Sequence, residues 1–326
     1  MLHETKTLQN KKIMPKPGES YRLVTRSDMD GLVCAVLLKE LGICDDIKFV
    51  HPKDMQDGIL EMGSNDISTN LPYVPGIYLA FDHHDSELER LEDTMNNHVI
   101  DVNAKSAARV VFDYFGGKAA FPRVSDAMME AVDKADAALF DREDVLNAQG
   151  WELLSFLMDS RTGLGRFRDF RISNYELMMQ LIDHCREKQD ISEILSLPDV
   201  KERVDLYKTH EMQFRDQIKR CSTIHGNLVV LDLRDEEIIY PGNRFMIYAL
   251  FPDTNISIHA IWGRAKQNTV FATGKSILNR NSKTTIGNLM LRYNGGGHSA
   301  AGTWQVDNND AEKVLGELIE QITTDG

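Results

Sequence analysis

Aspartates and histidines stand where two apolar segments end. The stretch "GIYLAFDHHDSE" places Asp82, His83 and His84 directly after an apolar run, and "RLVTRSDMDGLV" places Asp28 and Asp30 between an apolar run and a helical pattern. Ligands of open α/β sheets gather beyond the carboxyl ends of strands, so both sets are expected at one sheet edge. Clustered carboxylates repel unless a proton or cation intervenes, and carboxylate with imidazole suits Mn²⁺ or Mg²⁺. The alternative for either segment alone is helix capping by the aspartates and packing of the histidines in a turn.

A second candidate lies near the end of the chain, where "RYNGGGHSAAG" carries Gly295, Gly296, Gly297 and His298. Consecutive glycines let backbone amides approach an anion closely, and a histidine beside them can donate to a phosphate oxygen. A flexible turn is the alternative. The cations around this segment, candidates for substrate binding, are Lys275, Arg280 and Arg292.

The elements expected to position these residues alternate between strand and helix. Apolar runs at 21–25, 47–52, 76–81 and 98–102 alternate with helical patterns at 30–42 and 106–115. This order predicts an α/β fold with a mostly parallel sheet flanked by helices.

The rest of the chain contains a helical region followed by a strand-rich region. Residues 124–222 are mostly helical, ending in a charged segment at 198–221, and apolar runs at 228–234, 244–252, 256–264 and 270–276 read as strands of a small mixed or antiparallel sheet before a helix at 310–322. We expect a catalytic domain at 1–190, a helical linker at 191–222, a smaller α/β domain at 223–326, and the active-site cleft between the two domains.

Composition narrows the class of protein. The 326 residues are 42% hydrophobic and carry a formal charge of −13. This negative charge repels long nucleic acids, so we expect any nucleic-acid substrate to be short and bound by a local group of cations. Neither an apolar run long enough to span a membrane nor a signal peptide is visible, so we expect a cytoplasmic protein without membrane partners. The four cysteines form no C-x-x-C pair, and no P-loop, G-x-G-x-x-G or G-x-S-x-G motif occurs.

The sequence resembles the DHH phosphoesterase family, which is named for the triplet Asp82-His83-His84. The resemblance covers nearly the whole chain: the D-x-D element at 28–30, the triplet, a later aspartate in "AVDKADAALF", and a C-terminal "NGGGHSAAG" similar to the glycine-rich motif of the DHH-associated domain. It implies hydrolysis of phosphodiester or phosphoanhydride bonds with one or two divalent ions, commonly Mn²⁺.

Carried onto this sequence, the resemblance makes Asp28, Asp30, Asp82 and Asp136 metal ligands. His83 is the histidine assigned to the metal, although either triplet histidine could complete the ligand shell while the other orients it. Asp133, one helical turn from Asp136, and Asp159 in "FLMDSRTGLGRF" are rivals for the Asp136 role.

Two positions depart from the family pattern. Arg26 stands where the family usually has a histidine, and Asn70 stands where it usually has an aspartate. Arginine cannot ligate a metal and asparagine offers only a neutral oxygen, so we expect one of the two usual ions to be weakened or absent. Arg26 then either supplies part of the missing positive charge or forms a structural salt bridge.

The expected function is hydrolysis of short 5′-phosphorylated oligoribonucleotides, especially dinucleotides such as pGpG, to mononucleotides. His83, His84, His298 and Arg26 are the expected catalytic residues, because imidazole and guanidinium groups can hold protons and stabilise phosphate charge. The alternatives are an exopolyphosphatase or pyrophosphatase and a catalytically inactive nucleotide-binding module. A homodimer is a candidate assembly. A second basic segment, "DSRTGLGRFRDFR", contacts either substrate or the other domain.

Overall fold

The structure is a computed structural model that describes residues 12–91, 95–188 and 190–326. Part of the N-terminal stretch behind the expectation of no signal peptide lies outside these residues. The chain forms two compact units: unit 1 holds the described residues up to Ala137 together with Asn174–Asp190, and unit 2 holds Ala138–Ser173 and Ile191–Gly326. These units divide the chain differently from the predicted domains, because the predicted linker and the helices of 138–173 group with the C-terminal sheet.

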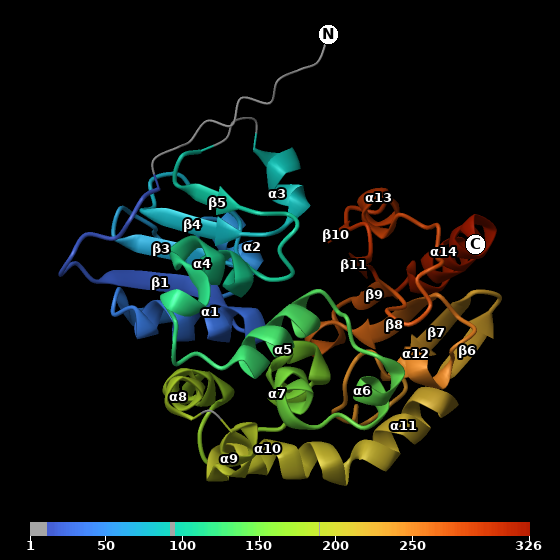
Figure 1. Ribbon diagram of the computed structural model, residues 1–326. Helices are drawn as coiled ribbons and strands as arrows, with labels where there is room; N and C mark the ends of the chain where they lie inside the picture. The colour runs from blue at the N-terminus through green and yellow to red at the C-terminus, as the bar shows by residue number, and fades with distance from the viewer. Residues whose placement is uncertain (1–11, 92–94, 189) are drawn as a thin grey trace. The chain divides into compact units, whose positions relative to one another are not determined.

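Unit 1 is built on the expected parallel sheet. Five strands lie in the order β2-β1-β3-β4-β5, and every neighbouring pair is parallel (Figure 1). The strands are β1 (Tyr21–Arg26), β2 (Cys44–Val50), β3 (Asp66–Thr69), β4 (Leu79–Asp82) and β5 (His98–Ile100). All residues of β3 and β4 are buried, although β3 is mostly polar, because both strands lie inside the sheet rather than at its edges.

Helices flank this sheet or pack on the helices beside it. They are α1 (Met29–Glu40), α2 (Pro52–Gln56), α3 (Asp85–Arg90), α4 (Ala107–Phe115), α5 (Asp126–Asp136) and α8 (Asn174–Glu187). Helix α1 is buried along most of its length and packs against β1, β2, α4, α5 and α8, which explains its lack of a polar face. The α/β fold class is confirmed.

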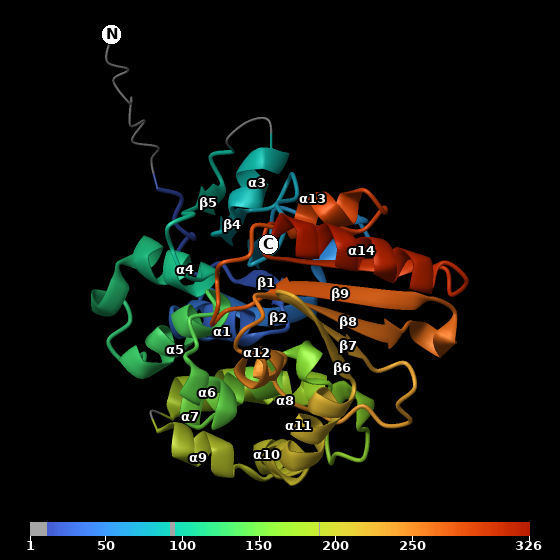
Figure 2. The same cartoon turned by 90° about the vertical axis from the view of Figure 1, so that its right-hand side faces the viewer.

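Unit 2 contains a six-stranded mixed sheet in the order β10-β11-β9-β8-β7-β6. Only β7 and β8 are paired in parallel among its described strands. The strands are β6 (Ser222–His225), β7 (Leu228–Asp232), β8 (Ile256–Trp262), β9 (Thr269–Lys275), β10 (Gly296–His298) and β11 (Ala301–Val306). Figure 2 shows β6 to β9 side by side with the C-terminal helix α14 (Ala311–Asp325) beside them.

The helices of unit 2 correct two predictions. The charged segment at 198–221, expected as part of a helical linker between two domains, forms two helices that break at His210 and group with unit 2. The run at 244–252, predicted as a strand, forms helix α12 instead, because a short buried apolar run has no periodicity that separates strand from helix. The Asn243 side chain accepts from the Phe245 N–H at this turn. The helices are α6 (Arg142–Leu146), α7 (Gly150–Met158), α9 (Ile191–Ser196), α10 (Pro198–Thr209), α11 (Glu211–Arg220), α12 (Met246–Leu250), α13 (Ile286–Leu291) and α14.

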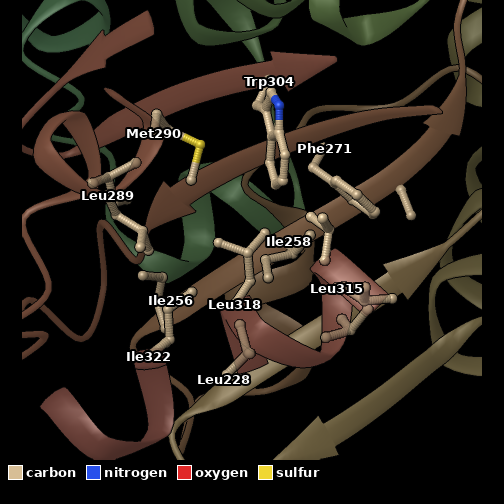
Figure 3. Close-up of a cluster of buried hydrophobic side chains, with 14 of the residues drawn as sticks. Leu228, Ile256, Ile258, Phe271, Leu289, Met290, Trp304, Leu315, Leu318 and Ile322 are labelled. Atoms are coloured by element: carbon tan, nitrogen blue, oxygen red, sulfur yellow. The ribbon is translucent and has the colours of Figure 1, made fainter. Parts of the chain in front are cut away.

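The core of unit 2 lies between its sheet and α14 (Figure 3). Ile256 and Ile258 of β8 and Phe271 of β9 face Leu318 and Ile322 of α14. Since neighbouring strand residues point to opposite faces, Ser257 and His259 lie on the other face of the sheet. Among the described residues, none of the helices is both long enough and apolar enough to cross a bilayer.

Candidate active site

The carboxyl ends of three neighbouring strands carry polar side chains in unit 1. Asp28 follows β1, Asn70 follows β3, and Asp82 ends β4. Asn70 has a φ of 54°, a left-handed conformation that asparagine tolerates better than most residues. Parallel pairing therefore brings together segments far apart in the sequence, as the strand-end argument predicts.

The turn from β1 into α1 has room only for glycine at position 31. A Cβ atom on Gly31 would lie 1.8 Å from the carbonyl oxygen of Arg26. Asp28 caps the helix, since its Oδ1 accepts from the Gly31 N–H at 3.0 Å. This tight turn fixes the backbone that carries Asp28 and Asp30.

Asp30 is almost completely buried at 1% exposure. Its Oδ2 accepts from the Ala107 N–H at 2.9 Å and its Oδ1 from the Ala108 N–H at 2.7 Å, both in the first turn of α4. Burial raises the pKa of the Asp30 carboxyl well above its usual range, and the nearby Asp136 and Asp28 carboxylates act in the same direction. A buried carboxylate beside other carboxylates is stabilised in its charged form by a neighbouring cation.

His83 meets Asp30 and Asp136 at that point. One ligand atom from each of the three residues lies within 4.8 Å of the others. His83 Nε2 is 2.7 Å from Asp136 Oδ2, yet it is a buried nitrogen without hydrogen-bond geometry to any described residue. Its other ring nitrogen, Nδ1, lies 3.3 Å from the Ala104 carbonyl, so the proton belongs on Nδ1. The Nε2 lone pair then points into a carboxylate pair, an arrangement that fits a divalent ion.

The protonation of His83 follows the same electrostatics. Burial lowers its pKa, but Asp136, Asp30 and Asp82 outweigh this effect and raise the pKa to about 9. The carboxylates therefore favour a positive charge at this position, which a proton or a divalent ion can supply.

His84 forms a second group with its neighbours Asp82 and His83. Asp82 Oδ1 accepts from the His83 N–H at 2.8 Å and lies 2.7 Å from His84 Nδ1. The bond to Asp82 raises the pKa of His84 against the opposing effect of burial. The His84 side chain is 41% exposed, whereas that of His83 is 12% exposed. His83 is thus the inner histidine and His84 the outer one.

The two departures from the family pattern both contact Asp28. Arg26 Nε lies 2.9 Å from Asp28 Oδ2, and Asn70 Nδ2 donates to Asp28 Oδ1 at 3.3 Å. Both oxygens of Asp28 therefore have donors from the protein. Asp28 belongs to neither group of described residues able to hold a metal.

The rivals of Asp136 have other partners. Asp133 accepts from Ser106 Oγ at 2.7 Å and from Arg109 Nε and Nη2 at 2.9 and 2.7 Å. Asp159 lies in unit 2 and pairs with two arginines. Asp136 is the one of the three in contact with His83.

The glycine-rich segment of unit 2 forms β10, which pairs with β11. A Cβ on Gly297 would lie 2.4 Å from the Ala301 carbonyl oxygen, and one on Gly295 would lie 2.9 Å from that of Thr303. A Cβ on Gly296 would meet nothing within 4 Å. Two of the glycines are therefore required by close strand approach, while β10 itself, including His298, is exposed.

The predicted cations near this segment already hold local contacts. Lys275 Nζ donates to the Ser282 carbonyl at 3.1 Å, Arg280 Nη2 to the Ala138 carbonyl at 2.8 Å, and Arg292 Nη1 to Gln321 Oε1 at 3.3 Å. Each keeps further donors for a ligand.

Sequence reasoning missed the backbone groups that support the cluster. The N–H groups of Ala107 and Ala108 and the carbonyl of Ala104 hold Asp30 and His83. Ser106 could have indicated these groups from the sequence. It caps α4 by accepting from the Arg109 N–H and so marks a helix N-terminus, where N–H groups stabilise anions.

The chain is similar over nearly its full length to a solved structure with high sequence identity. A pGpG-specific phosphodiesterase, PggH from Vibrio cholerae, shares 60% sequence identity with it at a TM-score of 0.82, covering 94% of this chain and 100% of that one.

More distant structures match less well. CDC45 from Entamoeba histolytica has 9% identity and a TM-score of 0.45, over 94% of this chain and 95% of that one. RecJ in complex with Mn²⁺ from Thermus thermophilus has 12% identity and a TM-score of 0.43, over 94% of this chain and 52% of that one. No family model and no curated protein matches the chain.

Proposed function

The chain belongs to the DHH phosphoesterase family, and on that premise we propose that it hydrolyses short 5′-phosphorylated oligoribonucleotides, above all pGpG, to mononucleotides. The observation that carries this proposal is the 60% identity to a pGpG-specific phosphodiesterase along the whole of that protein. The Asp30, His83 and Asp136 cluster supports it, because this donor set suits the metal-dependent chemistry of the family.

We propose that Mn²⁺ or Mg²⁺ binds Asp30, His83 and Asp136, with Asp82 beside them. When bound, such an ion lowers the pKa of a water molecule and polarises a phosphate oxygen. The chain's own part is to hold the ligands: two helix N–H groups fix Asp30, and the Ala104 carbonyl keeps the proton of His83 on Nδ1.

We propose that this is the principal ion and that a second is weak or missing. The usual second position loses a histidine and an aspartate to Arg26 and Asn70, and both of these contact Asp28. The Arg26 guanidinium would supply positive charge there and stabilise developing charge on the phosphate. Asp28 then acts by capping α1 and orienting Arg26.

His84 is proposed as the histidine that meets the substrate. Its Nδ1 is held by Asp82 at 2.7 Å, so a proton there leaves Nε2 for a hydrogen bond to the substrate. From unit 2, we propose that the N–H groups of Gly295–Gly297 and the ring of His298 bind phosphate, together with the cations Lys275, Arg280 and Arg292.

We also propose an oligomeric state and a cellular location for the protein. A homodimer in the cytoplasm fits the family and the acidic composition, and light scattering after size exclusion tests the dimer. Cell fractionation tests the location.

The decisive experiment is a substrate panel with purified protein and Mn²⁺, containing pGpG, pApA, a cyclic dinucleotide, polyphosphate and pyrophosphate. We expect GMP from pGpG, and an Asp82→Asn variant with the same thermal stability should lose this activity. Phosphate released from polyphosphate without turnover of pGpG would replace the proposal with the exopolyphosphatase alternative.

A further inference from the structure

Unit 2 contains a pocket beside the glycine-rich segment, lined in part by the second basic segment. Its volume is about 350 Å³, at the low end of the range for small-molecule sites. The floor is the sheet face opposite the core of Figure 3, formed by Ser257, His259, Ala272, Gly274, Ala301 and Thr303. All residues that line it belong to unit 2.

Small side chains on this sheet face create the space. Ala272, Gly274 and Ala301 stand on β9 and β11, while the larger Phe271 and Trp304 face the core. Tyr248 of α12 closes one side, and its hydroxyl bonds Gly274 O and Ser257 Oγ at 2.8 Å each. The hydrogen bonds of Tyr248 therefore fix this side of the pocket, and the small side chains leave space for a planar ring above the sheet.

Three arginines make the pocket cationic. Arg161, Arg166 and Arg244 line it. Asp159 Oδ1 pairs with Arg161 Nε at 2.7 Å, and Asp159 Oδ2 pairs with Arg244 Nε at 3.1 Å. Arg166 is exposed, its guanidinium makes no hydrogen bond or ion pair within the described part of the chain, and partial desolvation lowers its pKa. Three guanidinium groups against one carboxylate leave excess positive charge in a protein of net charge −13.

The floor offers hydrogen bonds that the protein does not use. Neither ring nitrogen of His259 has a hydrogen-bond partner among the residues the structure describes. Burial lowers the pKa of His259 to about 4, and Arg244 contributes to this, so the ring is neutral at pH 7. A neutral imidazole presents one donor and one acceptor to a ligand. His259 is half-buried and lines the pocket, so a polar ring bound there can take up these hydrogen bonds.

We propose that this pocket binds one nucleotide residue of the substrate, with His259 hydrogen-bonded to the base and Arg166 to the phosphate. The assignment rests on the proposed function for its ligand class. It is supported by β11, which lines the pocket with Ala301, Gly302 and Thr303 and pairs with the β10 strand of the proposed phosphate-binding segment. The pocket would thus bind a nucleotide more tightly than a phosphate chain without a base.

Titration calorimetry in EDTA, where metal-dependent turnover stops, tests the pocket with 5′-GMP, ribose 5-phosphate and inorganic phosphate. The variants are Arg166→Gln and His259→Leu, and the matched control is Arg264→Gln, an exposed arginine of unit 2 outside the pocket. We expect 5′-GMP affinity to fall roughly tenfold to hundredfold in the first two variants and to stay unchanged in the control. Ribose 5-phosphate should respond to Arg166→Gln alone.

Unchanged 5′-GMP affinity in either variant, at native thermal stability, would overturn the proposal. If His259→Leu does not fold, His259→Gln serves, since it keeps polarity but alters the hydrogen-bond geometry. The KM for pGpG separates this inference from the proposed function. If the wild type hydrolyses pGpG and both variants keep its KM, the pocket assignment is refuted and the proposed function stands. If 5′-GMP binding depends on Arg166 but pGpG is not hydrolysed, the proposed function is refuted and the pocket assignment stands.

Discussion

Replacing Asp136 by asparagine removes one negative charge from the metal cluster while keeping the shape of the side chain. Two unit charges 4 Å apart attract by about 4 kcal/mol at an effective dielectric constant of about 20, and a divalent ion doubles this attraction. A water that takes the place of the carboxylate recovers part of the loss. We therefore expect the Kd for Mn²⁺ to rise at least ~100-fold, which corresponds to about 2.8 kcal/mol, with a matching loss of pGpG hydrolysis.

The matched control is Asp133→Asn, one turn away on α5. The two side chains are similarly buried, at 14% exposure for Asp133 and 20% for Asp136. Asp133→Asn loses charge-assisted bonds to Arg109 and should cost about 1–3 kcal/mol of stability, yet leave Mn²⁺ affinity intact. Calorimetry of Mn²⁺ binding, with thermal unfolding alongside, measures both. Equal Mn²⁺ affinity in the parent and Asp136→Asn, or a larger loss in Asp133→Asn, would refute the assignment.

Three further predictions concern other parts of the chain. Gly297→Ala should lower the free energy of unfolding by about 1–3 kcal/mol, because its Cβ would overlap β11, while Gly296→Ala should change it little; urea denaturation compares them. Burial raises the pKa of Asp159, but two arginines outweigh it and lower the pKa to about 2, so its stabilisation is complete above its usual pKa of about 4 and is lost as pH falls toward 2. Acid unfolding of the parent should therefore show a stability loss between about pH 4 and pH 2 that Asp159→Asn lacks. The double variant Arg26→His, Asn70→Asp restores the family pattern and should raise Mn²⁺ stoichiometry by one ion per chain, measured by calorimetry.

Four strands of unit 1 were predictable because their apolar runs alternate with helical patterns, an order that favours a parallel sheet. The fifth, β3 (Asp66–Thr69), carries no apolar run that would predict it. The strand-end rule also placed Asp82 near Asp28 without any structure, whereas Asn70 was placed only through the resemblance to the family. The helix at 246–250 was not predictable, since its apolar run carries no period and its helical form depends on burial against neighbours.

The sequence identified which residues belong to the site, but it did not reveal most of the contacts between them. Helical spacing puts Asp133 and Asp136 on one face, and only tertiary packing decides which of them meets His83. The pairing of Arg26 with Asp28 likewise depends on a turn geometry that the sequence does not reveal. His259 gave no motif, because a lone histidine in a strand becomes informative only when its neighbours leave space around it.

The central claim is that one divalent ion is held where Asp30, His83 and Asp136 converge, and anomalous diffraction from Mn²⁺-soaked crystals tests it most directly. We expect one fully occupied manganese position bound by His83 Nε2 and the Asp30 and Asp136 carboxylates. Two fully occupied ions, or no ion at these three side chains, would contradict the account.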